Sequence, residues 1–86
     1  MTMPEPHQVP RQVDAELDAT GLTCPMPLLK AKQALNRLEV GQTLRVRATD
    51  PGSERDFDVF ARQSGHELLH ASHDGGAFTY VMRKTS

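Results

Sequence analysis

Hydrophobic and polar residues alternate along this chain with two different periods, and the change from one to the other marks out the expected elements. Val13, Ala15 and Leu17 alternate with acidic residues, which is the period of a half-buried strand. Between residue 25 and about residue 38 the spacing becomes helical, with apolar positions at Leu28, Ala31, Leu35 and Leu38. We therefore expect a strand followed by an amphipathic helix.

The strand period returns in the middle of the chain and is followed by a second helical stretch. Residues 44–48 alternate between apolar and polar side chains, which predicts a second strand. The Asp-Pro-Gly sequence at 50–52 predicts a turn, and residues 53–56 approximate a capping box at the start of a shorter helix. Gly65 ends this helix, whose buried stripe is expected to comprise Phe57, Phe60, Ala61 and Ser64.

Two further strands complete the pattern. Residues 66–73 predict a strand with less regular alternation, and Phe78, Tyr80 and Met82 alternate with other residues in a fourth. The sequence Asp74-Gly75-Gly76 between them is a strong hairpin signal. The alternation alone leaves open whether the three apolar side chains of the last strand face the core or the open side of the sheet.

The order of these elements predicts an α+β fold. Each strand-helix-strand crossover is expected to be right-handed, which puts both helices on the same face of the sheet. We therefore predict a two-layer α/β sandwich with the order β-α-β-α-β-β, in which a four-stranded mixed sheet carries both helices on one face.

Composition limits the class of protein and its surroundings. The chain has 86 residues, of which 37% are hydrophobic and 24% charged, which suits one small globular domain. Its net charge of −1 argues against a general binder of polyanions, and no apolar run approaches the roughly 18 residues of a membrane span. We expect a disordered proline-rich tail over residues 1–11, a single domain over residues 12–86, and a cytoplasmic location.

Candidate chemistry centres on the only cysteine, Cys24, which lies where the first helix is expected to begin. With Cys24 at the N-cap, Pro25 and Pro27 remove two of the four backbone donors that a helix start leaves unpaired. The N–H of Met26 then becomes the expected donor to the sulfur. A helix start favours a negative sulfur by about 0.3–1 kcal/mol, which would lower the thiol pKa by less than one unit.

The residues next to Cys24 also predict whether its side chain is buried or exposed. A lone cysteine can be a small buried hydrophobic residue, but the neighbouring Thr23 and the two prolines favour a surface loop. A single cysteine can form no internal disulfide, so any sulfur chemistry must finish on another molecule. The pattern thus predicts an outward-facing, weakly stabilised sulfur.

The residues around Cys24 resemble the signature of a known family. Residues 17–27 contain a Leu-Asp pair, then Gly-Leu, then Cys-Pro-x-Pro opening a helix. This order is similar to that of the TusA/SirA-like family of sulfur carriers, also described as sulfurtransferases. The similarity extends over about residues 14–84 and includes Gly41, residues 49–51, Arg55 and Asp56, residues 65–68 and residues 80–84.

The resemblance implies a sulfur relay. Cys24 would accept sulfane sulfur as a persulfide and pass it to a cysteine of a partner protein, while Pro25 and Pro27 shape the helix entry. The implied donors are cysteine desulfurases or rhodanese-like proteins. The implied acceptors are thiol-bearing proteins of tRNA thiolation, cofactor synthesis or sulfur metabolism. We expect no cofactor beyond the transient persulfide, no metal, no direct contact with nucleic acid or membrane, and a monomer acting stoichiometrically with its partners.

Two positions depart from some relatives in that family. Met26 stands between the prolines where some relatives carry a carboxylate, which changes the chemistry offered to a partner. Some relatives have a second cysteine near the position of Ala61, and this chain has none. An internal disulfide route is therefore excluded for Cys24.

Other polar residues are candidates for docking or support. Arg45 and Arg47 share one face of the second strand, which we expect to be the open side of the sheet, and Lys30 and Lys32 lie on the first helix. These residues form either a docking surface or an ordinary solvated face. Met26 is a further candidate docking residue. Finally, Asp50 and Arg55 are expected to hold the start of the second helix close to the Cys24 loop.

Three alternatives to a sulfur relay are weighed against it. His66, His70 and His73 would suit a metal on a helix, but on a strand the first two stand about 13 Å apart and the third points to the other side. A single-thiol redox or regulatory protein would need a Cys24-to-Cys24 dimer, because no resolving cysteine is present. An RNA-binding module is suggested by a fold-level similarity to the C-terminal domain of a bacterial translation initiation factor, against which the near-neutral charge speaks.

Overall fold

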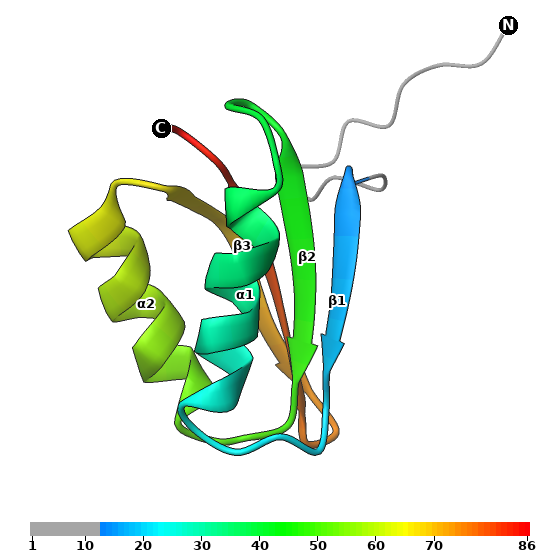
Figure 1. Ribbon diagram of the computed structural model, residues 1–86. Helices are drawn as coiled ribbons and strands as arrows, with labels where there is room; N and C mark the ends of the chain where they lie inside the picture. Colours follow the sequence, from blue (N-terminus) through cyan, green and yellow to red (C-terminus); the bar gives the residue numbers. More distant parts are fainter. Residues whose placement is uncertain (1–12) are drawn as a thin grey trace, which may run out of the picture.

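The computed structural model describes residues 13–86, which form one four-stranded sheet covered by two helices (Figure 1). The predicted order β-α-β-α-β-β is confirmed. In chain order the elements are β1 Ala15–Ala19, α1 Met26–Asn36, β2 Thr43–Ala48, α2 Ser53–Ser64, β3 Glu67–Asp74 and β4 Ala77–Arg83. The tail expected over residues 1–11 lies outside the described residues. Neither α1 nor α2 is long and apolar enough to cross a membrane.

The sheet is mixed, as predicted. Its strands follow the order β1-β2-β4-β3, so β2 and β4 are central. β1 pairs with β2 in parallel, and the pairs β2–β4 and β3–β4 are antiparallel. Figure 1 shows both helices on one face of this sheet, so the predicted two-layer sandwich is confirmed.

The core lies between the helices and the two central strands. Leu44, Val46 and Ala48 of β2 are fully buried and lie directly opposite three residues of β4, namely Met82, Tyr80 and Phe78 respectively. Opposed residues of an antiparallel pair share a face. The structure therefore answers the question left open by the alternation, because the apolar set of β4 faces the helices.

Each helix contributes its predicted stripe to this core. Ala31 and Leu35 of α1 are buried, and Leu28 and Leu38 pack against the core from its margin. In α2, Phe57 is fully buried. The remaining residues of the α2 stripe are half-buried.

The predicted capping box at the start of α2 is wrong. Gly52 occupies the N-cap, and no side chain of residues 13–86 caps the helix there. Ser53 is instead the first helical residue and is 1% exposed, and its hydroxyl shares a 2.8 Å hydrogen bond with the hydroxyl of Tyr80. A buried hydroxyl needs a partner, and here the partner comes from β4 and not from the helix backbone.

Glycines end two of the elements as predicted. Gly65 is the C-cap of α2 with a φ of 85°, the left-handed conformation common at helix ends. Gly75 and Gly76 link β3 to β4 with φ values of 59° and 86°. Positive φ at both central residues is typical of the tight hairpin that the sequence predicts.

Candidate functional site

Cys24 lies on the surface in the connection between β1 and α1. Figure 1 shows that the connections leading into α1 and α2 both lie at the lower end of the molecule as drawn. The sulfur therefore lies at the end where the two helices begin. The prediction of an outward-facing thiol agrees with this position.

The predicted capping geometry of Cys24 is wrong. α1 begins at Met26 with Pro25 at its N-cap, one residue later than expected, and no side chain within residues 13–86 caps it. The N–H of Met26 donates to the carbonyl oxygen of Thr23 at 2.9 Å and not to the sulfur. Pro27 is buried on the first turn, where it packs inward from the exposed Cys24 loop.

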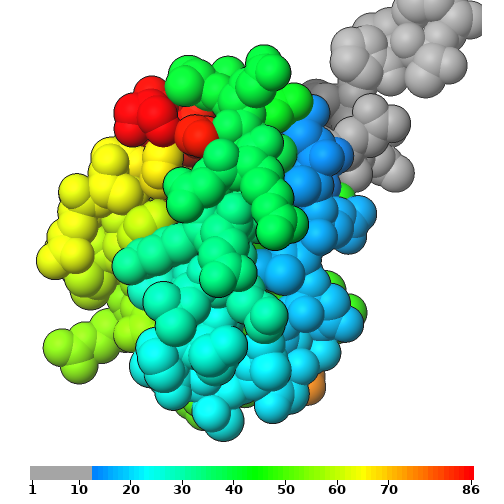
Figure 2. Space-filling model, in the orientation of Figure 1, coloured from blue at the N-terminus to red at the C-terminus, as the bar shows by residue number. Residues whose placement is uncertain are grey.

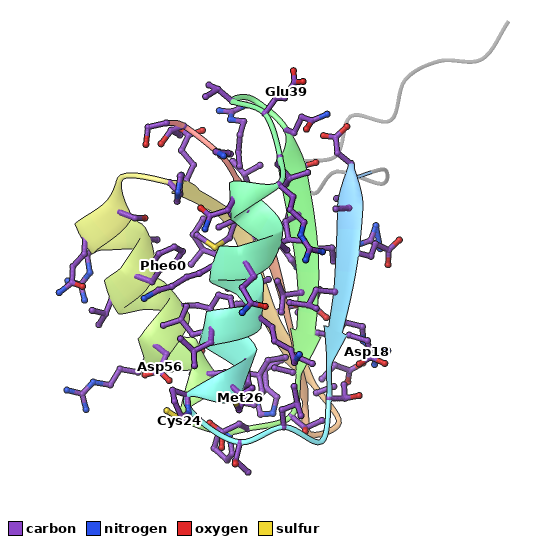
Figure 3. The ribbon with its side chains drawn as sticks, in the orientation of Figure 1. Asp18, Cys24, Met26, Glu39, Asp56 and Phe60 are labelled. Atoms are coloured by element: carbon purple, nitrogen blue, oxygen red, sulfur yellow. The ribbon has the colours of Figure 1, made fainter. Side chains whose placement is uncertain are left out.

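The partner of the thiol is a carboxylate from the other helix. The Cys24 thiol donates a hydrogen bond to Oδ2 of Asp56, with 2.9 Å between sulfur and oxygen. Asp56 belongs to the first turn of α2, and Figure 3 shows the two side chains next to each other at the end of the helical layer. The contact joins residues 32 positions apart, so local sequence patterns could not reveal it.

The electrostatics of the site are the reverse of the expectation from the helix start. The hydrogen bond to Asp56 raises the pKa of the Cys24 thiol above its ordinary value, and partial desolvation with the negative charges of Asp56 and Asp50 raises it further. An adjacent negative charge disfavours ionisation of an acid. The carboxylate of Asp56 bonds to the sulfur, whereas no backbone amide of the helix start within residues 13–86 does. The carboxylate therefore decides the direction in which the thiol pKa shifts.

Asp50 lies in the turn before α2, while the role predicted for Asp50 and Arg55 in holding this helix start close to the Cys24 loop stays a prediction. One oxygen of Asp50, Oδ2, accepts the N–H of Gly52 at 3.1 Å, which shapes the turn before α2. The backbone N–H of Asp56 in turn donates to the carbonyl of Gly52 at 3.1 Å. The turn thus fixes the first turn of α2, and with it the carboxylate that faces the sulfur.

A groove runs between α1 and α2 next to this site. It has a volume of about 330 Å³ and is lined by Leu28, Lys32, Arg55, Asp56, Val59, Phe60 and Gln63. Its lining is mixed, with both apolar and charged side chains. Nζ of Lys32 lies 5.3 Å from the centre of the Phe60 ring, a cation–π contact. Arg55 thus belongs to the groove beside Cys24, and its side chain is exposed.

Apolar side chains are exposed beside Cys24 on α1. Met26 is 40% exposed and Leu29 43% exposed. Figure 2 shows this side of the molecule, with α1 and α2 lying next to each other on its surface. Met26 therefore occupies the surface position that the sequence reasoning assigned to it, and Leu29 extends that surface by one turn.

The structure does not bring the arginines of β2 to the Cys24 site. Arg45 and Arg47 alternate with the buried residues of β2 and so face away from the helices, as expected. In register, Arg45 lies opposite Glu16 and Val81, and Arg47 lies opposite Asp18 and Thr79. Any docking role for these arginines belongs to the other side of the sheet.

The histidines have structural contacts of their own. Nδ1 of His66 accepts the backbone N–H of Thr85 at 3.1 Å, and the ring of His73 stacks on Phe78 with centroids 4.3 Å apart. A register shift between Leu68 and His70 explains the irregular alternation of β3. No group of three or more histidine, cysteine, aspartate or glutamate side chains within residues 13–86 could hold a metal ion.

Comparison with known proteins places the chain among sulfur carriers by sequence similarity. The family described as sulfurtransferase TusA matches residues 15–84. The sulfur carrier protein TusA of Allochromatium vinosum is 53% identical over 72 residues, which cover 84% of this chain and 95% of that protein. The sulfur carrier protein TusA of Pseudomonas putida is 48% identical over 71 residues, which cover 83% of this chain and 89% of that protein.

A solved structure shares the fold. The crystal structure of a SirA-like protein from Desulfitobacterium hafniense superposes with a TM-score of 0.73 at 26% identity, covering 84% of this chain and 99% of that one. The match to the TusA protein of Allochromatium vinosum and the match in fold each cover 84% of this chain. On these findings, the chain belongs to the TusA family of sulfurtransferases.

Proposed function

We propose that this protein is a sulfur carrier that accepts sulfane sulfur as a persulfide on Cys24 and relays it to a cysteine of a partner protein. The observation that carries the proposal is the exposed thiol of Cys24 at the end of the sandwich where both helices begin. Membership of the TusA family and the names of the relatives support it.

The proposed relay consists of two exchange steps at sulfur. The Cys24 thiolate attacks the terminal sulfur of a donor persulfide, the sulfur–sulfur bond of the donor breaks, and the donor leaves as a thiolate that takes up a proton. The thiolate of an acceptor then attacks the terminal sulfur of the Cys24 persulfide and releases Cys24. Each step moves one sulfur atom and consumes no oxidant or reductant. Because the chain has one cysteine, both steps join two proteins.

The proposed donors are cysteine desulfurases or rhodanese-like proteins. The proposed acceptors are thiol-bearing proteins of tRNA thiolation, cofactor synthesis or sulfur metabolism. The exposed side chains of Met26 and Leu29 offer an apolar contact beside the sulfur, and apolar surface of this kind is used by protein partners. We further propose a monomer that needs no cofactor beyond the bound sulfur and works in the cytoplasm, where a free thiol stays reduced.

Mass spectrometry tests the proposal directly. Incubation with a cysteine desulfurase and cysteine, or with a rhodanese and thiosulfate, should increase the mass of the Cys24 peptide by one sulfur atom. The Cys24→Ser variant is the matched control and should gain nothing. If wild-type protein gains no sulfur from either donor while Cys24 remains open to alkylation, the proposed function is wrong.

The redox alternative needs the Cys24 thiolate, as the relay does, and also a second copy of Cys24 to form a disulfide. Oxidation by peroxide requires the thiolate, and the hydrogen bond to Asp56 raises the pKa of Cys24 and so lowers the thiolate fraction at neutral pH. Non-reducing electrophoresis after mild peroxide treatment would reveal a Cys24-linked dimer if that alternative held.

A further inference from the structure

The contact between Cys24 and Asp56 has a consequence for sulfur transfer. We propose that Asp56 is a positioning residue that holds Cys24 as a neutral thiol in the free protein, and that a partner releases the thiolate by bringing a cationic side chain to the Asp56 carboxylate. The purpose of this restraint rests on the proposed sulfur relay. The restraint itself follows from the contacts of the free protein.

The restraint rests on the geometry of one hydrogen bond. Oδ2 of Asp56 accepts a hydrogen bond from the Cys24 thiol, with 2.9 Å between sulfur and oxygen. Its place on the first turn of α2 is fixed, since its own N–H donates to Gly52 at 3.1 Å. Loss of the thiol proton would remove this hydrogen bond and set two negative charges against each other. The raised pKa of Cys24 has the same cause.

No cation of residues 13–86 forms an ion pair with the Asp56 carboxylate. The neighbouring acid Asp58, by contrast, pairs with Arg62 at 2.8 Å. A second carboxylate, Asp50, acts on the sulfur with the same sign. The cations that line the adjoining groove, Lys32 and Arg55, make no hydrogen bond to either acid within the described residues.

The unpaired carboxylates define the chemistry of the partner. A lysine or arginine that approaches Asp56 would pair with it, withdraw the acceptor of the thiol hydrogen bond and favour the thiolate. The partner surface is therefore one that presents a cation beside its own sulfur-bearing cysteine. Attack on a disulfide-type sulfur depends on the thiolate fraction, so the carrier becomes reactive mainly where such a partner is bound.

The pH dependence of alkylation tests the restraint in the free protein. The rate of reaction of Cys24 with iodoacetamide should rise only in the alkaline range for wild-type protein. In Asp56→Asn the midpoint should move to lower pH, and the thiolate fraction at neutral pH should rise about tenfold for each unit by which the thiol pKa falls. Asp50→Asn should shift the profile in the same direction but less, because Asp50 does not bond to the sulfur.

Asp58→Asn is the matched control, because it removes the same charge from the same helix without touching Cys24. Its profile should coincide with that of wild-type protein. A profile of Asp56→Asn that coincides with wild-type, or an equal shift in Asp58→Asn, would overturn the proposal. Asp56→Ser, which also lacks the charge, should shift as Asp56→Asn does and provides a second variant if the amide is not tolerated.

The proposed role of a cation on the partner is tested with two small disulfides, one cationic and one neutral. At low salt, wild-type Cys24 should react faster with the cationic disulfide cystamine than with the neutral 2-hydroxyethyl disulfide, and the ratio of the two rates should be smaller in Asp56→Asn. Asp58→Asn should keep the wild-type ratio. Equal preference in wild-type protein and Asp56→Asn would overturn the role of the cation. These measurements need no sulfur donor, so their outcome is independent of whether Cys24 gains sulfur in the mass-spectrometric experiment.

Discussion

At the scale of single residues, the pairing of Ser53 with Tyr80 links α2 to the sheet. Ser53 is the buried polar residue of the core among residues 13–86, and the Tyr80 ring stacks on Phe57 with centroids 4.4 Å apart. Burial raises the pKa of the Tyr80 phenol. The two hydroxyls satisfy each other, so removal of either one leaves the other without its partner.

We therefore expect Ser53→Ala to lower the free energy of unfolding by about 1–3 kcal/mol, because it leaves the Tyr80 hydroxyl buried and unpaired. Tyr80→Phe should also destabilise, by about 1 kcal/mol. The double variant should lose less than the sum of the two, since the second change removes the group that the first left unpaired. Urea denaturation of the four proteins measures this coupling. Strict additivity would contradict the reciprocal pairing.

At the scale of the elements, the end of α2 depends on backbone conformation. Gly65 has a φ of 85°, and a Cβ built on it would meet no atom of residues 13–86 within 4 Å. Space is thus available for a side chain, and only the left-handed backbone opposes one. Substitutions at Gly65 therefore measure the energetic cost of the left-handed backbone without a contribution from steric crowding.

Gly65→Ala should therefore destabilise the protein by about 1–2 kcal/mol, the cost of a left-handed backbone for an ordinary residue. Gly65→Asn should cost less, because asparagine adopts this conformation more readily. Thermal and urea unfolding of the two variants give the comparison. An equal loss of stability in both would indicate that some contact, and not the backbone, sets the cost.

The elements also show how far the sequence alone could lead. All six elements and the mixed sheet follow from local periodicity and from the turn residues, because a half-buried strand or helix must repeat its apolar positions. The orientation of β4 could not follow, since Val81 on the outer face is apolar too and is 1% exposed. The capping box failed because the hydroxyl of Ser53 has a partner 27 residues away.

The candidate site was predictable in part for the same reason. Cys24 with its prolines forms a continuous motif, and Asp50 belongs to a local turn. The contact of Cys24 with Asp56 depends on how α2 packs beside α1, which no local pattern encodes. The sign of the pKa shift of the thiol therefore came out opposite to the expectation from the helix start.

At the scale of the whole molecule, the sheet has a protected centre and two exposed margins. Within residues 13–86, β2 and β4 are paired on both sides, whereas β1 and β3 each have one neighbouring strand. The helices cover the inner face of the central strands, whose inward residues are nearly all fully buried. Stability should therefore be uneven across the sheet.

Hydrogen exchange should reveal this difference. Amides of β2 and β4 that bond within the sheet are expected to exchange most slowly, at the rate set by global unfolding. Those of β3 should exchange earlier, because its residues are partly or fully exposed and no other strand of the described part of the chain pairs with its outer edge. If the amides of β3 exchanged as slowly as those of β4, the molecule would open only as a single cooperative unit.

The position of Tyr80 gives the molecule a built-in optical signal. The chain contains one tyrosine and no tryptophan, so its fluorescence above the phenylalanine range comes from that one ring. The ring stacks on Phe57 and its hydroxyl bonds to Ser53, both of which belong to the same helix as Asp56. Near-ultraviolet circular dichroism and tyrosine emission therefore report on how α2 packs against the sheet. The binding of a partner that disturbs the first turn of this helix can be followed without any label.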